Sequence, residues 1–264
     1  YIDPTNPYQS LHPVGHFFEI PNLILNGTLG KLLHERPKLQ TLLLHNVDTT
    51  GVNLDPTILG QHLKSRADMS FEVIDRQLED TGGGLARVTH HEQPVNSSTS
   101  NDDNIKKSSR LEIVEGLALP NERLEQKLQY YNTMTTWIQI DPLLRTFGLD
   151  RELLVQQHQQ KLNNDNYDKI SNKISDGIQA LSHRLPTYVT LKNVKKRHSL
   201  GHEDVLPTLQ YEKLWSDMTK LKELDVQYFC VDRRRGQQLK DPDRLDNWIQ
   251  DGSKDYVERL CDFS

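Results

Sequence analysis

The sequence predicts an α/β fold with a mixed, mostly parallel sheet and helices on both of its faces, a three-layer α/β/α arrangement. The chain has 264 residues, which is enough for one large α/β domain. The run Leu39–His45 is almost wholly apolar, as is typical of a central strand buried on both faces. Strand patterns alternate with helical patterns along the chain, and this order favours parallel strands joined by helices.

The amino-terminal part of this pattern is a succession of helix, strand, helix and strand. Apolar residues recur at helical spacing within Ile20–Glu35, and Pro37 ends that predicted helix. The strand Leu39–His45 comes next. A second helix is predicted over Pro56–Ser65, and a second strand over Ser70–Asp75, where apolar and polar residues alternate.

A glycine-rich turn and a polar segment follow. Gly82, Gly83 and Gly84 mark the turn, and Leu85–Thr89 is predicted to leave it as a strand. The segment His90–Ser109 is rich in Asn, Ser, Asp and Lys and nearly lacks apolar residues. Because such a composition cannot offset the entropy lost on ordering, we expect a mobile surface loop there.

The remaining sequence carries further helix and strand patterns. Helices are predicted over Asn121–Leu128, Leu209–Leu224 and Arg244–Leu260, a helix with a loop within Gln156–Asn172, and strands over Thr136–Ile140, Tyr188–Leu191 and Gln227–Val231. We expect the strands Leu39–His45, Ser70–Asp75 and Thr136–Ile140 to lie buried side by side in one sheet. Residues 1–264 are interpreted as parts of one domain, with 190–264 as its least strongly patterned portion.

Bulk properties exclude several classes of protein. The net charge of −5 argues against a nucleic-acid-binding protein, and the short basic runs Lys192–Arg197 and Arg233–Arg235 are typical of solvated faces or phosphate contacts. No apolar run approaches the roughly 20 residues that cross a bilayer. Cys230 and Cys261 form no CxxC pair, which indicates a reducing compartment, the cytoplasm. Because the sequence starts at Tyr1 rather than Met, a plastid address is the alternative.

Motifs for common cofactors and nucleophiles are missing from the sequence. It contains no GxGxxG, no GxxxxGK[ST], no HExxH and no GxSxG. Asp48 follows a predicted buried strand and precedes Gly51, a position suited to a hard cation that bridges phosphates. An Asx turn is the alternative interpretation. The glycines at 82–84 would let the hydroxyl groups of a ligand approach the backbone, or would simply form a hairpin turn.

Four segments carry a more specific pattern. They are His12–His16 (HPVGH) with Asn26 and Gly27, Asn46–Gly51 (NVDTTG), Phe71–Asp75 (FEVID) with Asp80, Gly83 and Gly84, and Leu111–Glu115 (LEIVE) with Pro120 and Tyr131–Thr133. In this order and spacing they resemble the UTP:glucose-1-phosphate uridylyltransferase family, the UDP-sugar pyrophosphorylases. The resemblance implies a Rossmann-like nucleotidyltransferase fold, of which this chain is the central and later part of the catalytic domain.

The resemblance also implies an activity and roles for particular residues. It implies that UTP and a sugar-1-phosphate form a UDP-sugar, most simply UDP-glucose, and pyrophosphate, with Mg²⁺ as cofactor; an oligomer is compatible with it. Asp48 corresponds to the magnesium-binding and catalytic Asp, and Arg233 to a phosphate-contacting Lys, although a surface turn is an equal alternative for Arg233. The residues implied to bind the substrates are Gly15, His16, Asn46, Glu72, Gly83, Gly84 and Asn132.

Departures from the family pattern keep a second hypothesis open. The family's glycine-rich nucleotide loop does not occur in this sequence, Phe17 and Phe18 replace its Gly-Asp, and Met134 replaces a second Asn that faces the sugar. A non-catalytic homologue that binds a nucleotide sugar or a partner subunit is therefore the alternative. A glycosyltransferase ranks last, since Asn46-Val47-Asp48 offers one carboxylate where an Asp-x-Asp motif is expected.

Overall fold

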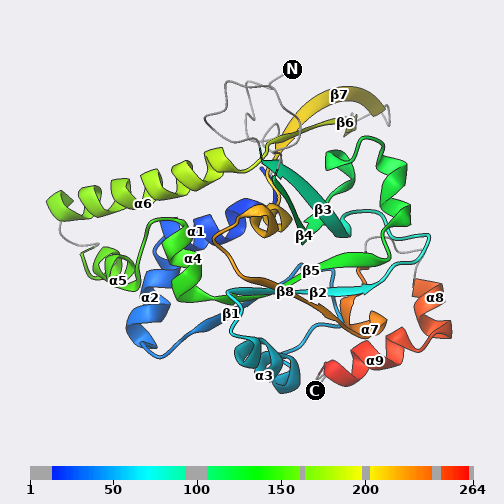
Figure 1. Cartoon of the computed structure of the whole chain (residues 1–264), viewed down its shortest axis with the longest axis horizontal. Helices are drawn as coiled ribbons and strands as arrows, with labels where there is room; N and C mark the ends of the chain where they lie inside the picture. The colour runs from blue at the N-terminus through cyan, green and yellow to red at the C-terminus, as the bar shows by residue number, and fades with distance from the viewer. Residues whose placement is uncertain (1–13, 93–105, 161–163, 198–202, 240–244, 262–264) are drawn as a thin grey trace. The chain divides into compact units, whose positions relative to one another are not determined.

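Figure 1 shows the computed structural model of the chain, which describes residues 14–92, 106–160, 164–197, 203–239 and 245–261. The chain divides into two compact units. The first unit comprises the described parts of 1–40 and 140–218, and the second comprises those of 41–139 and 219–264. Each unit is thus assembled from two separate stretches of sequence. No described helix is both long enough and apolar enough to cross a membrane.

The second unit contains a six-stranded sheet. Its strands are β1 (Thr41–Leu44), β2 (Met69–Asp75), β3 (Gly84–Glu92), β4 (Lys106–Val114), β5 (Tyr130–Gln139) and β8 (Val226–Cys230). Their order is β4-β3-β5-β2-β8, and β1 pairs with β5 beside this path. The pair β2 and β8 is parallel, and the other neighbouring strands of this sheet pair antiparallel.

The prediction of a mixed α/β fold is confirmed, but the prediction of a mostly parallel sheet is wrong. β1, the helix α3 (Pro56–Ser65) and β2 do form a strand–helix–strand unit. However, β5 pairs antiparallel with both strands and lies between them. The strand–helix–strand pattern predicts that β1 and β2 run in the same direction. It does not predict that β5, which is distant in sequence, lies between them and pairs with both.

The strand predicted over Leu39–His45 is present as the shorter β1. It pairs with β5 from Thr41↔Gln139 to Leu44↔Thr136, and all four of its residues are only partly buried. Its interpretation as a central strand buried on both faces is therefore wrong, and among the described strands β1 pairs with β5 alone. The prediction that β1, β2 and the strand around Thr136 lie buried side by side is confirmed for their pairing but wrong for the burial of β1, and Ile140 begins helix α4 instead of ending the strand.

The core of the second unit forms around β2. This strand lies between β5 and β8, and its first six residues are buried. Phe71 and Ile74 are fully enclosed, as is Trp137 of β5. The polar positions of β2 are therefore buried as well as the apolar ones. The alternation in its sequence does not mark a face exposed to solvent.

The β3–β4 hairpin corrects the boundaries of the predicted loop at His90–Ser109. The two strands stay in register from Gly84↔Val114 to Glu92↔Lys106, so 90–92 and 106–109 belong to strands. The predicted loop includes 90–92 and 106–109 because these residues are polar, but polar residues also form the backbone hydrogen bonds of a strand pair. The rest of the predicted loop, 93–105, lies outside the described residues.

The helices of the second unit are short. The predicted helix Pro56–Ser65 is confirmed as α3, where the Asp55 side chain accepts bonds from two backbone N–H groups. The predicted helix Asn121–Leu128 is a 3₁₀ helix, η5 (Glu122–Lys127), preceded by η4 (Gly116–Ala118). The helical region predicted over Arg244–Leu260 contains α8 (Leu245–Gln250) and α9 (Ser253–Leu260), and α7 (Arg233–Gly236) follows β8.

The first unit is mainly helical. Its helices are η2 (His16–Phe18), α1 (Glu19–Leu25), α2 (Thr28–Glu35), α4 (Ile140–Thr146), α5 (Arg151–Gln159) and α6 (Asn164–Arg184). The single helix predicted over Ile20–Glu35 is two helices, because Gly27 takes φ of 80° between them. α2 packs closely on α5, where a Cβ at Gly30 would lie 2.2 Å from the Leu154 carbonyl oxygen.

The first unit also contains a separate β-hairpin, β6 (Tyr188–Arg197) with β7 (Glu203–Glu212). The strand predicted at Tyr188–Leu191 is confirmed and is longer than expected. The helix predicted over Leu209–Leu224 is wrong at its start, since 209–212 continue β7, and a 3₁₀ helix, η6 (Trp215–Lys220), follows. Pairing with β6 overrides the helical spacing of apolar residues in this stretch. The polar stretch Gln156–Asn172 lies in α5 and α6 apart from Gln160, which caps α5, and 161–163, which are outside the described residues.

Candidate functional site

The loop that follows β1 carries the predicted metal ligand. Asn46 and Asp48 are half-buried, and the Asn46 carbonyl accepts the Thr49 N–H at 3.1 Å, which closes a turn. The Asp48 carbonyl accepts the Leu239 N–H at 2.9 Å. The Oδ1 atom of Asp48 and the hydroxyl of Thr50 are buried and have no hydrogen-bond partner within the described chain. A buried carboxylate oxygen without a donor is a position where a cation or a ligand group would be accommodated.

This loop fits a cation that is shared with a ligand better than a cation held by protein alone. Within the described residues, no three His, Cys, Asp or Glu side chains are grouped so that they could hold a metal ion. Mg²⁺ in phosphate-transferring sites is commonly bound through one or two carboxylates together with substrate phosphates. Asp48, with its unpaired Oδ1, is compatible with that kind of site.

The loop between β2 and β3 is fixed by buried charges. Asp80 is 4% exposed, and its Oδ2 accepts the Gln77 N–H at 2.8 Å. Arg76 donates to the carbonyl oxygens of Asp80 at 2.9 Å and of Gly82 at 2.9 Å. Arg233 from α7 makes two further bonds to the Asp80 carboxylate, at 2.8 and 2.9 Å. The chain therefore holds this loop rigidly from both sides.

The two predicted sugar-binding glycines lie in crowded positions. The Gly83 N–H donates to a Glu115 carboxylate oxygen at 2.8 Å, and a Cβ at Gly83 would lie 2.5 Å from that carboxyl group. A Cβ at Gly84 would lie 2.5 Å from the Tyr130 carbonyl oxygen. Close packing accounts for both glycines without a ligand, and their contact with a sugar stays a prediction.

β5 contains an irregularity beside these loops. Along β2, Phe71 pairs with Thr136 and Val73 pairs with Asn132, so β5 has extra residues between the two pairs. Within this bulge, Met134 has φ of 63°, which is uncommon for a residue other than Gly or Asn. The Asn132 side chain holds it, because its Oδ1 accepts the Met134 N–H at 3.1 Å.

Tyr131 connects these parts. Its hydroxyl donates to Gln238 Oε1 at 2.8 Å and lies 3.3 Å from the Thr81 carbonyl oxygen. Burial raises the pKa of Tyr131, and the charges of Asp80 and Glu115 raise it further, so the hydroxyl stays protonated and able to donate. The Gln238 side chain in turn donates to the Thr133 carbonyl at 3.3 Å.

The structure therefore brings several predicted residues to one end of the sheet, at the carboxyl ends of β1 and β2. The Thr49 hydroxyl donates to the Thr133 carbonyl at 3.4 Å, which joins the Asp48 loop to the bulge of β5. The Asn132 N–H donates to the Gly83 carbonyl at 3.0 Å, which joins the bulge to the glycine turn. Carboxyl ends of strands are where open α/β sheets bind ligands.

Glu72 occupies surroundings that the sequence did not indicate. Glu72 is fully buried, and its carboxylate accepts bonds from Arg235 and from Trp137 Nε1. Desolvation opposes the charge of Arg235, but the hydrogen bonds to Glu72 and the charge of Glu72 raise the pKa of Arg235 above its usual value. Sequence reasoning missed Arg235 as a partner; the only available signal was its place in a basic run beside a strand end.

Gly15 and His16 belong to the first unit, whereas the other predicted site residues belong to the second. Gly15 has φ of 98°, and a Cβ there would lie 2.1 Å from the Lys213 carbonyl oxygen, so glycine is required by the backbone. His16 is exposed, and its Nδ1 lies 2.6 Å from Glu19 Oε1. Both residues have structural explanations, and their contact with a nucleotide stays a prediction.

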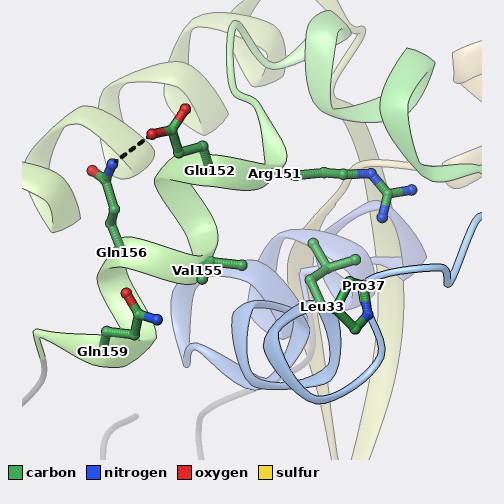
Figure 2. Close-up of a pocket in the computed structure, with 7 residues that line it drawn as sticks. All are labelled: Leu33, Pro37, Arg151, Glu152, Val155, Gln156 and Gln159. Carbon is green, nitrogen blue, oxygen red and sulfur yellow. Dashed lines mark hydrogen bonds between the residues drawn. The ribbon is translucent and has the colours of Figure 1, made fainter.

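The first unit has a surface groove of about 410 Å³ between α2 and α5, shown in Figure 2. It is lined by Leu33, Pro37, Arg151, Glu152, Val155, Gln156 and Gln159. The Gln156 amide donates to Glu152 Oε1 at 3.3 Å at its edge. No residue predicted from the sequence to bind substrate lines this groove.

The chain has a mixed α/β fold that resembles the nucleotidyltransferase domain of the UDP-glucose pyrophosphorylases. It is similar to a variant of the UDP-glucose pyrophosphorylase from Leishmania major solved in complex with UDP-glucose, with a TM-score of 0.57 and 20% identity. That match covers 91% of this chain and 42% of that chain. The UDP-glucose phosphorylase from Trypanosoma brucei gives a TM-score of 0.57 and 20% identity over 91% of this chain and 41% of that chain.

The chain thus spans about two fifths of the length of the solved structures it matches. Neither protein-family models nor curated protein sequences match this chain. The resemblance is one of fold, to the UDP-glucose pyrophosphorylases.

Proposed function

We propose that this chain is part of a UTP:sugar-1-phosphate uridylyltransferase that makes a UDP-sugar, most simply UDP-glucose. The observation that carries the proposal is the unpaired Oδ1 of Asp48, which lies in a loop bonded to the β5 bulge beside Asn132 and Gly83. The likeness of fold to UDP-glucose pyrophosphorylases supports the choice of reaction.

In the proposed reaction, a phosphate oxygen of the sugar-1-phosphate attacks the α-phosphorus of UTP. The bond between that phosphorus and the oxygen bridging to the β-phosphate breaks, and pyrophosphate leaves with the electron pair. No proton has to move and no covalent enzyme intermediate is required, so catalysis consists of positioning and charge stabilisation.

Asp48 would hold Mg²⁺ together with the phosphates, and the ion would neutralise charge that develops on them. Asn132 and the backbone of the turn at Gly83 would orient the sugar hydroxyls. Asn46 would assist from the same loop as Asp48.

A second candidate function is binding of a nucleotide sugar without turnover. The ion pair between Arg233 and Asp80 favours it, since the cation proposed to offset phosphate charge is already matched by a buried carboxylate. In the transferase, Arg233 would contact a substrate phosphate while it stays paired with Asp80.

A paired assay of the full-length protein that contains this chain tests the proposal. Pyrophosphate release from UTP and glucose-1-phosphate is measured with and without Mg²⁺, and UDP-glucose binding is measured by calorimetry. The transferase predicts both UDP-glucose binding and Mg²⁺-dependent pyrophosphate release. Binding without release supports the second candidate. If the protein shows no binding and no release, both candidates are ruled out. Gln156→Ala is the matched control, because this amide lies in the groove of the first unit and takes no part in the proposed site.

The proposed location is the cytoplasm. Cys230 and Cys261 are both exposed free thiols, which agrees with a reducing compartment.

A further inference from the structure

A buried ion pair joins α7 to the centre of the sheet. Arg235 Nε donates to Glu72 Oε2 at 2.7 Å, and its Nη2 donates to Glu72 Oε1 at 2.9 Å. Arg235 is 4% exposed and Glu72 is fully buried. Trp137 Nε1 on β5 adds a third bond to Glu72, at 2.8 Å. The guanidinium is thereby bonded to β2 through Glu72, and Glu72 is in turn bonded to β5.

The other edge of the same guanidinium faces the loop that follows Asp48. Arg235 Nη1 donates to Asn53 Oδ1 at 2.5 Å, and its Nη2 donates to the Asn53 carbonyl at 3.0 Å. Asn53 itself is exposed and lies outside any helix or strand. An exposed loop residue is thus tied directly to a buried charge pair.

Two further contacts join the same loop to the segment that begins with α7. The Leu239 N–H donates to the Asp48 carbonyl at 2.9 Å. Gly51 approaches the backbone of Arg234 so closely that a Cβ at Gly51 would lie 2.1 Å from the Arg234 carbonyl oxygen. Residues 48–53 are therefore held at both ends and in the middle by residues 234–239.

α7 also contacts the loop that leads to the glycine turn. Arg233, two residues before Arg235, makes two bonds to the carboxylate of Asp80, whose loop leads to Gly83. One short helix thus connects the loop of Asp48 and the loop of Gly83. A shift of this helix would displace the two loops relative to each other.

We propose that Arg235 is a positioning residue for the site. Its pair with Glu72 fixes α7 on the sheet, and α7 fixes the position of the Asp48 loop relative to the glycine turn. This assigns Glu72 to the support of the site instead of to direct contact with the sugar. The significance for catalysis rests on the proposed function, but the support of the Asp48 loop can be tested without it.

Two variants test the proposal at different strengths. Asn53→Ala removes one of the Arg235 contacts at an exposed position and leaves the pair with Glu72 intact. Arg235→Lys keeps the positive charge but cannot span Glu72 and Asn53 with a planar fork. Gln156→Ala, which removes a single amide bond in the first unit, serves as control for both.

The first readout is hydrogen exchange of the ligand-free chain, followed on peptides covering 46–53 and 237–239. Asn53→Ala is expected to raise exchange in both segments, and Arg235→Lys to raise it further, while Gln156→Ala leaves both unchanged. The amides of Thr49 and Leu239 report directly, because they bond to the Asn46 and Asp48 carbonyls. Unchanged exchange in both variants would overturn the proposal.

The second readout is the Mg²⁺ concentration that gives half-maximal pyrophosphate release. Loss of residues that orient a metal ligand commonly costs about 10- to 100-fold in metal affinity, so we expect the midpoint to rise at least about tenfold in Arg235→Lys. Faster exchange with an unchanged midpoint would overturn the role of Arg235 in the site. If the wild-type chain releases no pyrophosphate but exchange rises in the variants, the proposed function fails and the support of the Asp48 loop by Arg235 stands.

Discussion

Arg233 and Asp80 form a two-pronged ion pair, in which Nη1 lies 2.8 Å from Oδ2 and Nη2 lies 2.9 Å from Oδ1. Asp80 is 4% exposed and the Arg233 side chain is 22% exposed. The same Nη1 also donates to the Asp75 carbonyl at 2.9 Å. The pair fastens the end of β2 and the glycine turn to α7, so the cation expected to serve phosphate already has a structural partner.

Asp80→Asn should lower stability, because it keeps the shape of the side chain but leaves the Arg233 charge without its carboxylate. We expect the free energy of unfolding, measured in urea, to fall by about 2 kcal/mol, less than for a fully buried pair because Arg233 is partly exposed. Asp232→Asn is the matched control on the same helix, since its partner Arg234 is exposed and Asn caps a helix as well as Asp does. Equal effects of the two substitutions would contradict this prediction.

Asp48→Asn should affect the reaction far more than the fold. The change removes the charge that a hard divalent ion requires but leaves the backbone bond from Leu239 in place. We expect pyrophosphate release to fall at least about 100-fold with the melting temperature nearly unchanged, a loss typical of removing one preorganised electrostatic contact. Full Mg²⁺-dependent release by this variant would remove Asp48 from the metal site.

Gly84→Ala should destabilise the second unit. The added Cβ would lie 2.5 Å from the Tyr130 carbonyl oxygen, so backbone on β3 or β5 must move. A cost of about 1 to 3 kcal/mol is expected from urea unfolding. Gly60→Ala is the control, because nothing lies within 4 Å of its Cβ in helix α3, and it should stabilise the protein by about 0.5 to 1 kcal/mol. The prediction is wrong if both alanines act in the same direction.

Met134→Asn should increase stability. Met134 has φ of 63°, a conformation that costs most L-residues about 1 to 2 kcal/mol but that Asn adopts more readily. The bond from the Met134 N–H to Asn132 Oδ1 uses only backbone at position 134 and would survive. We expect a gain of about 1 kcal/mol, seen as a higher melting temperature. A lower melting temperature would show that contacts of the thioether outweigh the backbone strain.

Stability should decrease as the pH falls from 7 to 5, in part because of His62. Burial lowers the pKa of His62, which is fully enclosed and bonded to Ser70 Oγ at 2.8 Å. The folded state therefore keeps His62 neutral at pH values where the unfolded chain takes up a proton. Its contribution is complete above the unfolded pKa of about 6.5 and is lost below it, by at most about 1.4 kcal/mol per pH unit. His62→Gln should flatten this slope in urea unfolding measured at several pH values; an identical slope would contradict it.

Local sequence patterns predicted the helices and strands that are determined by interactions between residues close in sequence. Asp55 and Pro56 begin α3 through a side-chain cap and a fixed φ, and both features act within a few residues. The alternation of apolar and polar residues over Ser70–Asp75 likewise predicted the strand β2. The segment motifs at Asn46, Asp48, Gly83 and Asn132 predicted residues that the fold then brings to one end of a sheet.

The sequence alone determined that the chain is a mixed α/β protein and where most of its helices and strands lie, because short-range propensity and apolar periodicity decide those features. Tertiary structure alone decided that β5 inserts antiparallel between β1 and β2, that Glu72 pairs with Arg235, and that Arg233 pairs with Asp80. Glu72 and Arg235 are 163 residues apart in the sequence, and Asp80 and Arg233 are 153 residues apart. Their selection depends on which strand becomes a neighbour and on the high cost of burying an unpaired charge, and neither quantity can be read from a local window of sequence.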